Sequence, residues 1–175
     1  MRAKPGLPVQ PLALQELRLA DWMALKAARR EAFACGVPGL DTYFHRLAVQ
    51  QSAKGLASVF VLVEQPRPEV AIGFYALSAA QVEAAHLPAA LAKRLPRYPI
   101  PCFRMGRLAC HVSHQGQGLG AVLLGLAVSR CRQAMQSVGA VVLIVDAKDT
   151  QAAGFYAHHG FSAASDAPLT LFLKL

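Results

Sequence analysis

Three glycines fall within five positions of the stretch HQGQGLG, which runs from His114 to Gly120. Apolar runs flank the stretch, which is typical of a loop that opens a helix. A glycine-rich loop of this kind is suited to anions, because bare backbone N–H groups and the positive end of the helix dipole face the ligand. The chemistry indicated is phosphate binding.

Spacing separates the kinds of phosphate site. A P-loop needs Lys followed by Ser or Thr after its last glycine, and the loop lacks that pair. The dinucleotide pattern G-x-G-x-x-G/A is met by Gly116, Gly118 and Ala121, but only 55 residues follow Gly120, which is too short for the remaining βα units. The pyrophosphate of coenzyme A and a purely structural turn are the other interpretations.

The second half of the chain reads as a regular alternation around this loop. We expect strands over 102–112, 140–147 and 169–175, and helices over 119–136 and 150–160. The helix after the loop is almost uniformly apolar, so we expect it to be buried. A strand, a loop, a helix and a second strand form a crossover, which favours parallel pairing of the two strands.

The first half predicts antiparallel pairing. Strands over 58–64 and 70–79 are separated by a short Pro-rich link, which indicates a hairpin. A first strand near Leu12 is expected to enter a helix capped by Asp21 and continued through Arg30. A second helix should end near Gly55, and a short one should follow over 88–95. The fold class is therefore α/β, a mixed sheet flanked by helices, in one domain over residues 1–175.

Composition indicates a soluble protein that needs no disulfides or metal. Hydrophobic residues make up 54% of the chain and charged residues 16%. No apolar run is long enough for a membrane span, and the N-terminus lacks the features of a secretory signal, so we expect a cytoplasmic protein. The four cysteines are scattered, without metal-ligand spacing, and we expect reduced thiols and no metal.

The net charge of +8 is unevenly distributed. Residues 92–107 contain five basic side chains and no acid, and a second basic group precedes residue 31. Such patches are either solvated surface or an electrostatic site for phosphates. The residues are Lys93, Arg94, Arg97, Arg104 and Arg107 in the first group, and Lys26, Arg29 and Arg30 in the second.

Two motifs in order resemble those of the GNAT acetyltransferases. The loop fits Q/R-x-x-G-x-G/A through Gln115, Gly118 and Gly120, and TQAAGFYAHHGF downstream is similar to the second GNAT signature. Longer stretches, among them LPRYPIPCFRMGRLA, resemble the acetyltransferase toxins of bacterial toxin–antitoxin systems, the TacT- and AtaT-like group. The departures are Ala34 and His111, where this group commonly has Asp.

The resemblance implies a GNAT fold, in which a parallel central pair of strands splays around acetyl-CoA. The coenzyme is the acetyl donor, and the acceptor is the α-amine of an amino acid esterified to tRNA. A cognate antitoxin and a homodimer are implied as well. The coenzyme-binding positions carried over are Leu108, Ala109, Cys110, His111, Gln115, Gly116, Gln117, Gly118, Leu119, Gly120, Ala121 and Phe155.

The same resemblance gives the catalytic positions. A backbone N–H near Leu108 or Ala109 would polarise the thioester carbonyl, and Tyr156 would protonate the leaving thiolate. Core packing is the alternative role for Tyr156. Asp41, Glu83 and His111 are possible general bases, although structural or solvated roles are expected for all three.

The basic residues Lys26, Arg29, Arg30, Lys93, Arg94 and Arg97 are expected to contact tRNA, because phosphate contacts give sequence-independent affinity. Two other functions stay open. One is a GNAT enzyme that acetylates a small amine or a protein N-terminus. The other is a non-catalytic module that binds coenzyme A or nucleic acid.

Overall fold

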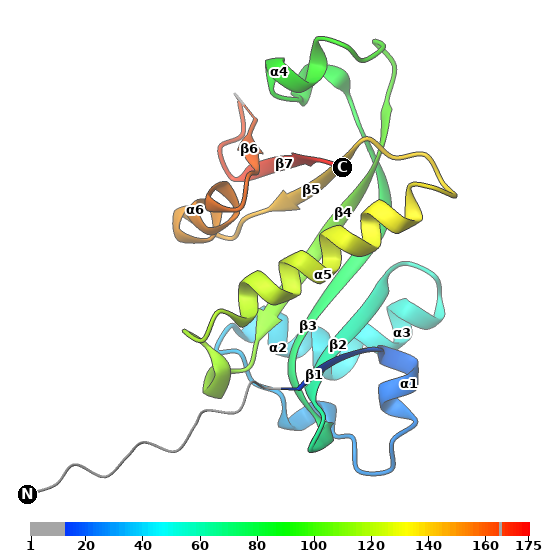
Figure 1. Cartoon of the computed structure of the whole chain (residues 1–175), viewed down its shortest axis with the longest axis vertical. Helices are drawn as coiled ribbons and strands as arrows, with labels where there is room; N and C mark the ends of the chain where they lie inside the picture. The colour runs from blue at the N-terminus through cyan, green and yellow to red at the C-terminus, as the bar shows by residue number, and fades with distance from the viewer. Residues whose placement is uncertain (1–12, 165) are drawn as a thin grey trace, which may run out of the picture.

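A single mixed sheet organises the chain in the computed structural model, which describes residues 13–164 and 166–175 (Figure 1). Its order is β1-β2-β3-β4-β5-β7-β6. Among the strands of the described residues, only the β4–β5 pair is parallel, and the other five pairs are antiparallel. The strands are β1 (Leu14–Arg18), β2 (Ser58–Glu64), β3 (Arg67–Val82), β4 (Ile100–Cys110), β5 (Val142–Asp146), β6 (Ser162–Ala163) and β7 (Thr170–Lys174).

The predicted hairpin and the predicted parallel crossover are both confirmed, and with them the mixed α/β class. The helices are α1 (Leu19–Met23), α2 (Pro38–Thr42), α3 (Ala48–Ala53), α4 (Ala89–Ala92), α5 (Leu119–Ala134) and α6 (Thr150–His158). Short 3-10 turns lie at Arg30–Ala32, Ala84–His86 and Val112–His114, and a π-helical turn at Tyr43–Leu47 joins α2 to α3. No helix among the described residues is long and apolar enough to cross a membrane.

Helices cover both faces of the sheet. One face packs against α5 and part of α6, through a core that includes Phe60, Leu123 and Leu143. The opposite face packs under α1, α2 and α3 at one end, where Trp22 and Phe74 are fully buried. At its other end this face carries a smaller core beside α4. In Figure 1, α5 crosses the sheet diagonally in front, while α1 and α4 lie near opposite ends of the molecule.

Two sequence-based expectations about helices are wrong. The helix predicted from Asp21 through Arg30 spans only Leu19–Met23, and the residues after it form turns that end in the 3-10 segment Arg30–Ala32. The glycine-loop helix α5 is not buried all round. Leu123 and Ala127 face the core, whereas Val122 is 38% exposed. Only one face of α5 is therefore buried, although its sequence is apolar on both faces.

A side-chain cluster fastens the C-terminal half of α5 to the sheet. Arg130 pairs with Glu16 of β1 and donates to the hydroxyl of Tyr75 on β3 at 3.2 Å. Its guanidinium also lies 3.9 Å from the ring centroid of Phe60. One arginine therefore joins three strands to the helix through a charge, a hydrogen bond and a cation–π contact.

The other half of α5 approaches β3 closely at Gly73. A Cβ at this position would lie 2.8 Å from Leu123 Cδ1 and 3.1 Å from the carbonyl oxygen of Ala109. Leu123 is fully buried, so it has little room to move aside. Glycine at 73 therefore sets how closely the helix packs on the sheet.

We expect Gly73→Ala to lower the free energy of unfolding by about 1–3 kcal/mol, because it overpacks this contact. Gly125→Ala is the matched control. A Cβ there meets nothing within 4 Å, and alanine raises helix propensity, so this variant should be neutral or up to about 1 kcal/mol more stable. Urea unfolding of both variants measures the difference, and equal effects would contradict the packing argument.

Candidate active site

The parallel strands β4 and β5 pair over only four residues and then part. Pairing runs from Cys102 with Val142 to Met105 with Val145. Beyond Met105, β4 continues to Cys110, whereas β5 ends at Asp146. The edge of β4 that faced β5 is therefore left without a strand partner after Met105, and its backbone groups are open to a ligand.

A bulge marks the place where the strands part. Ala76 lies opposite Arg107 and Leu77 lies opposite Met105, so Gly106 is an extra residue in β4. A bulge of this type bends and twists the strand that carries it. The bulge lies one residue after the last pair with β5, at the point where the two strands part.

A cavity of about 870 Å³ occupies the opening between the strands. Its walls come from four parts of the chain: α2 with the turn that precedes it, the end of β4, the loop and start of α5, and the segment from β5 into α6. The volume lies within the range of small-molecule binding sites. Among its lining residues are Cys35, Val37, Leu40, Arg107, Leu108, Ala109, Cys110, Gln115, Gly120, Asp146, Phe155 and Tyr156.

The glycine loop borders the cavity, which its two ends, Gln115 and Gly120, line. Gly116 and Gly118 have φ values of 75° and 79°, a conformation that glycine adopts without strain. The five backbone N–H groups from Gly116 to Gly120 donate no hydrogen bond to any described residue. They precede or open α5, a helix of 16 residues. Free donors and a helix N-terminus together form an anion site.

Gln115 ties this loop to two walls of the cavity. Its side-chain amide donates to the carbonyl oxygens of Cys35, at 2.8 Å, and of Cys110, at 3.1 Å. The first carbonyl belongs to the turn before α2 and the second to the end of β4. The side chain of Gln115 therefore joins two walls of the cavity. Both of its amide N–H groups are used in these hydrogen bonds, so they are not free to bind a ligand.

Tyr156 points into the same cavity from α6. Its ring packs against Phe155 and Phe161, with centroids 5.2 and 5.5 Å away. The phenol oxygen makes no hydrogen bond to the described residues. Burial raises the pKa of Tyr156 to about 12, so the hydroxyl keeps its proton at neutral pH and is free to donate it to a bound group.

Two thiols line the cavity without being reactive. Burial raises the pKa of Cys110 to about 11. The pKa of Cys35 also rises to about 11, mainly through burial and further through its contact with Asp41. Since the thiolate is the nucleophile, neither cysteine competes for an acyl group at neutral pH. All four cysteines are free.

The predicted coenzyme positions divide into two groups. Cavity-lining positions are Leu108, Ala109, Cys110, Gln115, Gly120 and Phe155. The remaining positions, His111, Gly116, Gln117, Gly118, Leu119 and Ala121, belong to the loop segment and the start of α5, outside the lining. Leu119 is a core residue, 4% exposed, so only its backbone is available to a ligand.

The three candidate general bases do not line the cavity. Asp41 accepts the backbone N–H of Cys35 at 2.7 Å, and His111 accepts the backbone N–H of Ser113 at 3.2 Å. Both side chains therefore have local structural roles. Glu83 lies at the start of the 3-10 turn beside α4. Asp146 lines the cavity, and its carboxylate pairs with Arg104 and accepts the hydroxyl of Thr170.

The bulge also decides where two arginines point. Cys102 packs in the core beside α4, and alternation places Arg104 on that same face. Arg107 is three positions after Arg104, an odd number, so in a regular strand its side chain would lie on the other face, beside α5. Because Gly106 is extra, Arg107 instead pairs with Ala76, whose side chain lies in the core under α2. Both guanidinium groups therefore lie on the face opposite α5.

The predicted tRNA-contacting residues are not brought together into one patch. Lys93, Arg94 and Arg97 follow α4, on the face that carries Arg104 and Arg107. Lys26, Arg29 and Arg30 follow α1, which lies near the opposite end of the molecule (Figure 1). Arg29 donates to the backbone carbonyls of Lys26 and Ala28, so it also shapes its own turn.

Sequence reasoning missed several cavity residues. The sequence places Arg107 only in a basic stretch, yet its side chain lines the cavity and its guanidinium lies 4.9 Å from the ring centroid of Tyr43. Val37 and Leu40 line it from a segment more than 60 residues before the glycine loop. The sequence predicts a helix that ends near Gly55, but no local signal places the start of that helix beside β4.

Known proteins match both the sequence and the fold. The acetyltransferase (GNAT) domain family matches residues 55–163. A tRNA-acetylating toxin of Mycobacterium tuberculosis is 35% identical over 144 residues, covering 82% of this chain and 84% of that protein.

Two solved structures are similar at the level of the fold and the sequence. AtaT complexed with acetyl-methionyl-tRNAfMet has a TM-score of 0.83 and 28% identity over 92% of this chain and 94% of that one. A tyrosine-to-phenylalanine mutant of the AtaT toxin, bound to the C-terminus of the antitoxin AtaR and acetyl-CoA, has a TM-score of 0.76 and 27% identity over 93% of each chain.

The helix that carries Tyr156 begins at a capped residue. Asp149 accepts the backbone N–H of Ala152 at 2.8 Å, which satisfies one free donor of α6. We expect Asp149→Ala to lower the free energy of unfolding by about 1 kcal/mol. Lys148→Ala removes only a solvent-exposed ion pair with Asp149 and should change it by less than about 0.5 kcal/mol. Thermal unfolding of the two variants tests the cap.

Proposed function

Because the chain belongs to the GNAT acetyltransferase family, we propose that it transfers the acetyl group of acetyl-CoA to the α-amine of an aminoacyl-tRNA. The observation that carries the proposal is the cavity between the parted strands, which has free backbone donors at one end and the free phenol of Tyr156 in its wall. Loss of the α-amine's nucleophilicity would block peptide-bond formation, so the product would halt translation.

The donor is held mainly by backbone in this proposal. The N–H groups from Gly116 to Gly120 bind the pyrophosphate, supported by the α5 dipole. The unpaired edge of β4 from Leu108 to Cys110 hydrogen-bonds the pantetheine arm as a neighbouring strand would. A backbone N–H at Leu108 or Ala109 polarises the thioester carbonyl and stabilises the oxyanion.

Tyr156 acts as the general acid. When the tetrahedral intermediate collapses, the phenol gives its proton to the departing sulfur. Burial supports this role, since a phenol with a pKa of about 12 stays protonated through the neutral range. The attacking amine loses its proton to water, because the ester lowers the basicity of an aminoacyl amine and no unpaired carboxylate or imidazole among the described residues lines the cavity.

The acceptor approaches the cavity from the face opposite α5. Arg107 lies at the cavity, and Arg104 and the basic residues after α4 extend positive charge along the same face. Phosphate contacts of this kind orient a polyanion without reading its sequence. The two compared toxins, one named as tRNA-acetylating and one complexed with an acetylated tRNA, support this acceptor class.

The biological setting follows from the acceptor. An enzyme that acts on aminoacyl-tRNA works in the cytoplasm, where we place this protein. Residues 1–175 form one acetyltransferase domain in this proposal, which the single continuous sheet supports. A cognate antitoxin is the proposed partner, by analogy with AtaT bound to AtaR, and a homodimer is the proposed assembly.

Transfer of label identifies the acceptor. The protein is incubated with [14C]acetyl-CoA and charged tRNA, and the aminoacyl groups are released and analysed for N-acetyl amino acids. We expect label on the amino acid only when it is esterified to tRNA, with a KM for tRNA that rises with salt. Label on free amino acids, small amines or peptide N-termini instead would assign the enzyme to a different acceptor, and no transfer at all would indicate a module that only binds.

Replacing the phenol tests the acid. Tyr156→Phe should lower kcat by about 10²–10⁴-fold, because the thiolate must leave without a placed proton. Tyr98→Phe is the matched control, since Tyr98 is 62% exposed and lies outside the cavity, and it should retain full activity. The wild-type rate should also show no fall centred on pH 10, the ordinary phenol value, since the raised pKa keeps the proton in place. Full activity in Tyr156→Phe would refute the assignment.

A further inference from the structure

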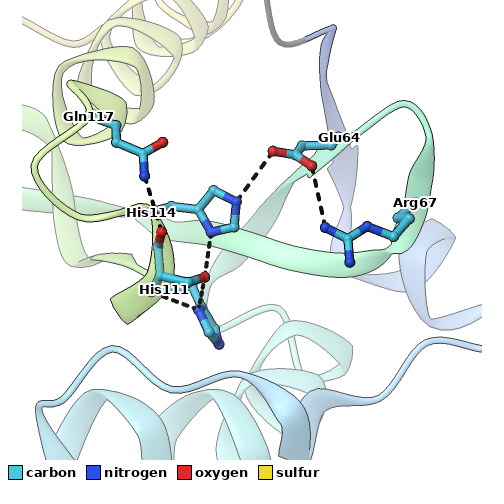
Figure 2. Close-up of polar contacts among 6 residues, drawn as sticks. Glu64, Arg67, His111, His114 and Gln117 are labelled. Atoms are coloured by element: carbon cyan, nitrogen blue, oxygen red, sulfur yellow. Dashed lines mark hydrogen bonds and ion pairs between the residues drawn. The ribbon is translucent and has the colours of Figure 1, made fainter. Parts of the chain in front are cut away.

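A chain of polar contacts lies directly before the glycine loop and leads away from it into the β2–β3 hairpin (Figure 2). The hydroxyl of Ser113 lies 2.8 Å from Nδ1 of both His111 and His114. Nε2 of His114 lies 3.3 Å from a carboxylate oxygen of Glu64, at the end of β2. The other oxygen of Glu64 lies 3.8 Å from Arg67. None of these contacts has a role in acetyl transfer as described above.

The inner part of this chain is shielded from water. The side chains of His114 and Glu64 are 16% and 13% exposed, whereas that of Arg67 is 64% exposed. A hydrogen bond between a shielded imidazole and a carboxylate is worth more than a surface ion pair, because water screens it less. We therefore expect the His114–Glu64 hydrogen bond to contribute more to holding the chain of contacts than the Glu64–Arg67 ion pair.

The hydrogen-bond directions make the chain continuous. His111 Nδ1 accepts the backbone N–H of Ser113, so this nitrogen carries no proton. The Ser113 hydroxyl donates to Nδ1 of His114, and Nε2–H of His114 donates to Glu64, so His114 uses one ring nitrogen as an acceptor and the other as a donor. The carboxylate of Glu64 thus completes a chain that reaches the end of β4.

This chain holds the segment from which the loop starts. His111 to His114 form the 3-10 turn and its cap, and the loop follows at once. The side-chain amide of Gln117 donates to the carbonyl of Ser113 at 3.1 Å, so the loop itself rests on the same turn (Figure 2). Gln115 anchors the loop on the cavity side, and Glu64 anchors it on the hairpin side.

We propose that Glu64, acting through His114, is a positioning residue for the acetyl donor, which holds the glycine loop with its free N–H groups aimed at the coenzyme pyrophosphate. The inference rests on the proposed function only for the identity of the donor. Binding energy from such donors depends on their preorganisation, because a loop that must be ordered on binding loses affinity. Glu64 should therefore affect donor affinity and leave the chemical step unchanged.

The test compares two donors in Glu64→Leu. With acetyl-CoA, KM should rise about tenfold with kcat within about twofold of wild type, the effect of losing one charge-assisted hydrogen bond. With S-acetylpantetheine, which has no pyrophosphate, KM should equal that of the wild type. Glu64→Gln keeps an acceptor for His114 and should restore KM for acetyl-CoA to within about threefold of wild type.

Two further variants guard against a merely structural effect. Arg67→Ala removes only the exposed ion pair and should leave both KM values unchanged. His114→Asn retains a polar group near Ser113 but loses the reach to Glu64, so it should reproduce Glu64→Leu. Equal KM increases for both donors, a lowered kcat, or no change in any variant would overturn the proposal.

Calorimetry tests the role of Glu64 in donor binding without depending on which acceptor the enzyme uses. Titration of coenzyme A into wild type and Glu64→Leu needs no tRNA, and the variant should bind about tenfold more weakly. If the wild type binds coenzyme A but acetylates no aminoacyl-tRNA, the proposed function fails while the role of Glu64 stands. If the two proteins bind coenzyme A equally, the role of Glu64 fails whatever the acceptor is.

Discussion

The parting of β4 and β5 is the constraint on which the site depends. A parallel pair that stayed together to the end of β4 would satisfy its own backbone groups and leave no space between the strands. Here pairing stops at Met105, and the extra residue Gly106 bends β4 at that point. The Arg104–Asp146 pair bridges the two strands where they separate, so the opening has a fixed starting point. Every wall of the cavity is arranged around this opening.

The helix α5 can serve such a site only because it is fixed along its length. Gly73 allows its N-terminal half to pack closely on β3, and Arg130 joins its C-terminal half to Glu16, Tyr75 and Phe60. The glycine loop is fixed in turn by Gln115 on one side and by the His114–Glu64 contact on the other. A loop whose glycines favour flexibility is therefore surrounded by rigid supports, which keeps its N–H groups in one arrangement.

Local patterns predicted what depends on local interactions. The β-rich runs over 58–64 and 70–79 and the Pro-rich link between them predicted the hairpin, and the glycine loop between strand and helix predicted the parallel crossover. The helix through Arg30 was wrong because the turns after Met23 are held by tertiary packing of Trp22 and Phe33, which periodicity does not encode. The bulge at Gly106, the wall formed by Val37 and Leu40, and the contact between Glu64 and His114 join residues distant in sequence, and no motif marks them.

At the proposed site, backbone groups face the acetyl donor and side chains face the acceptor. On the donor side, the groups available are the N–H groups of the loop and the edge of β4, which any sequence that keeps the bulge and the glycines would present. On the proposed acceptor side, the available groups are the side chains of Arg104, Arg107 and the basic residues after α4, together with the cavity-lining Val37 and Leu40. Substitution of these side chains can change which acceptor binds without altering the backbone groups that bind the acetyl donor. One fold can therefore keep a single acetyl donor while its acceptor varies.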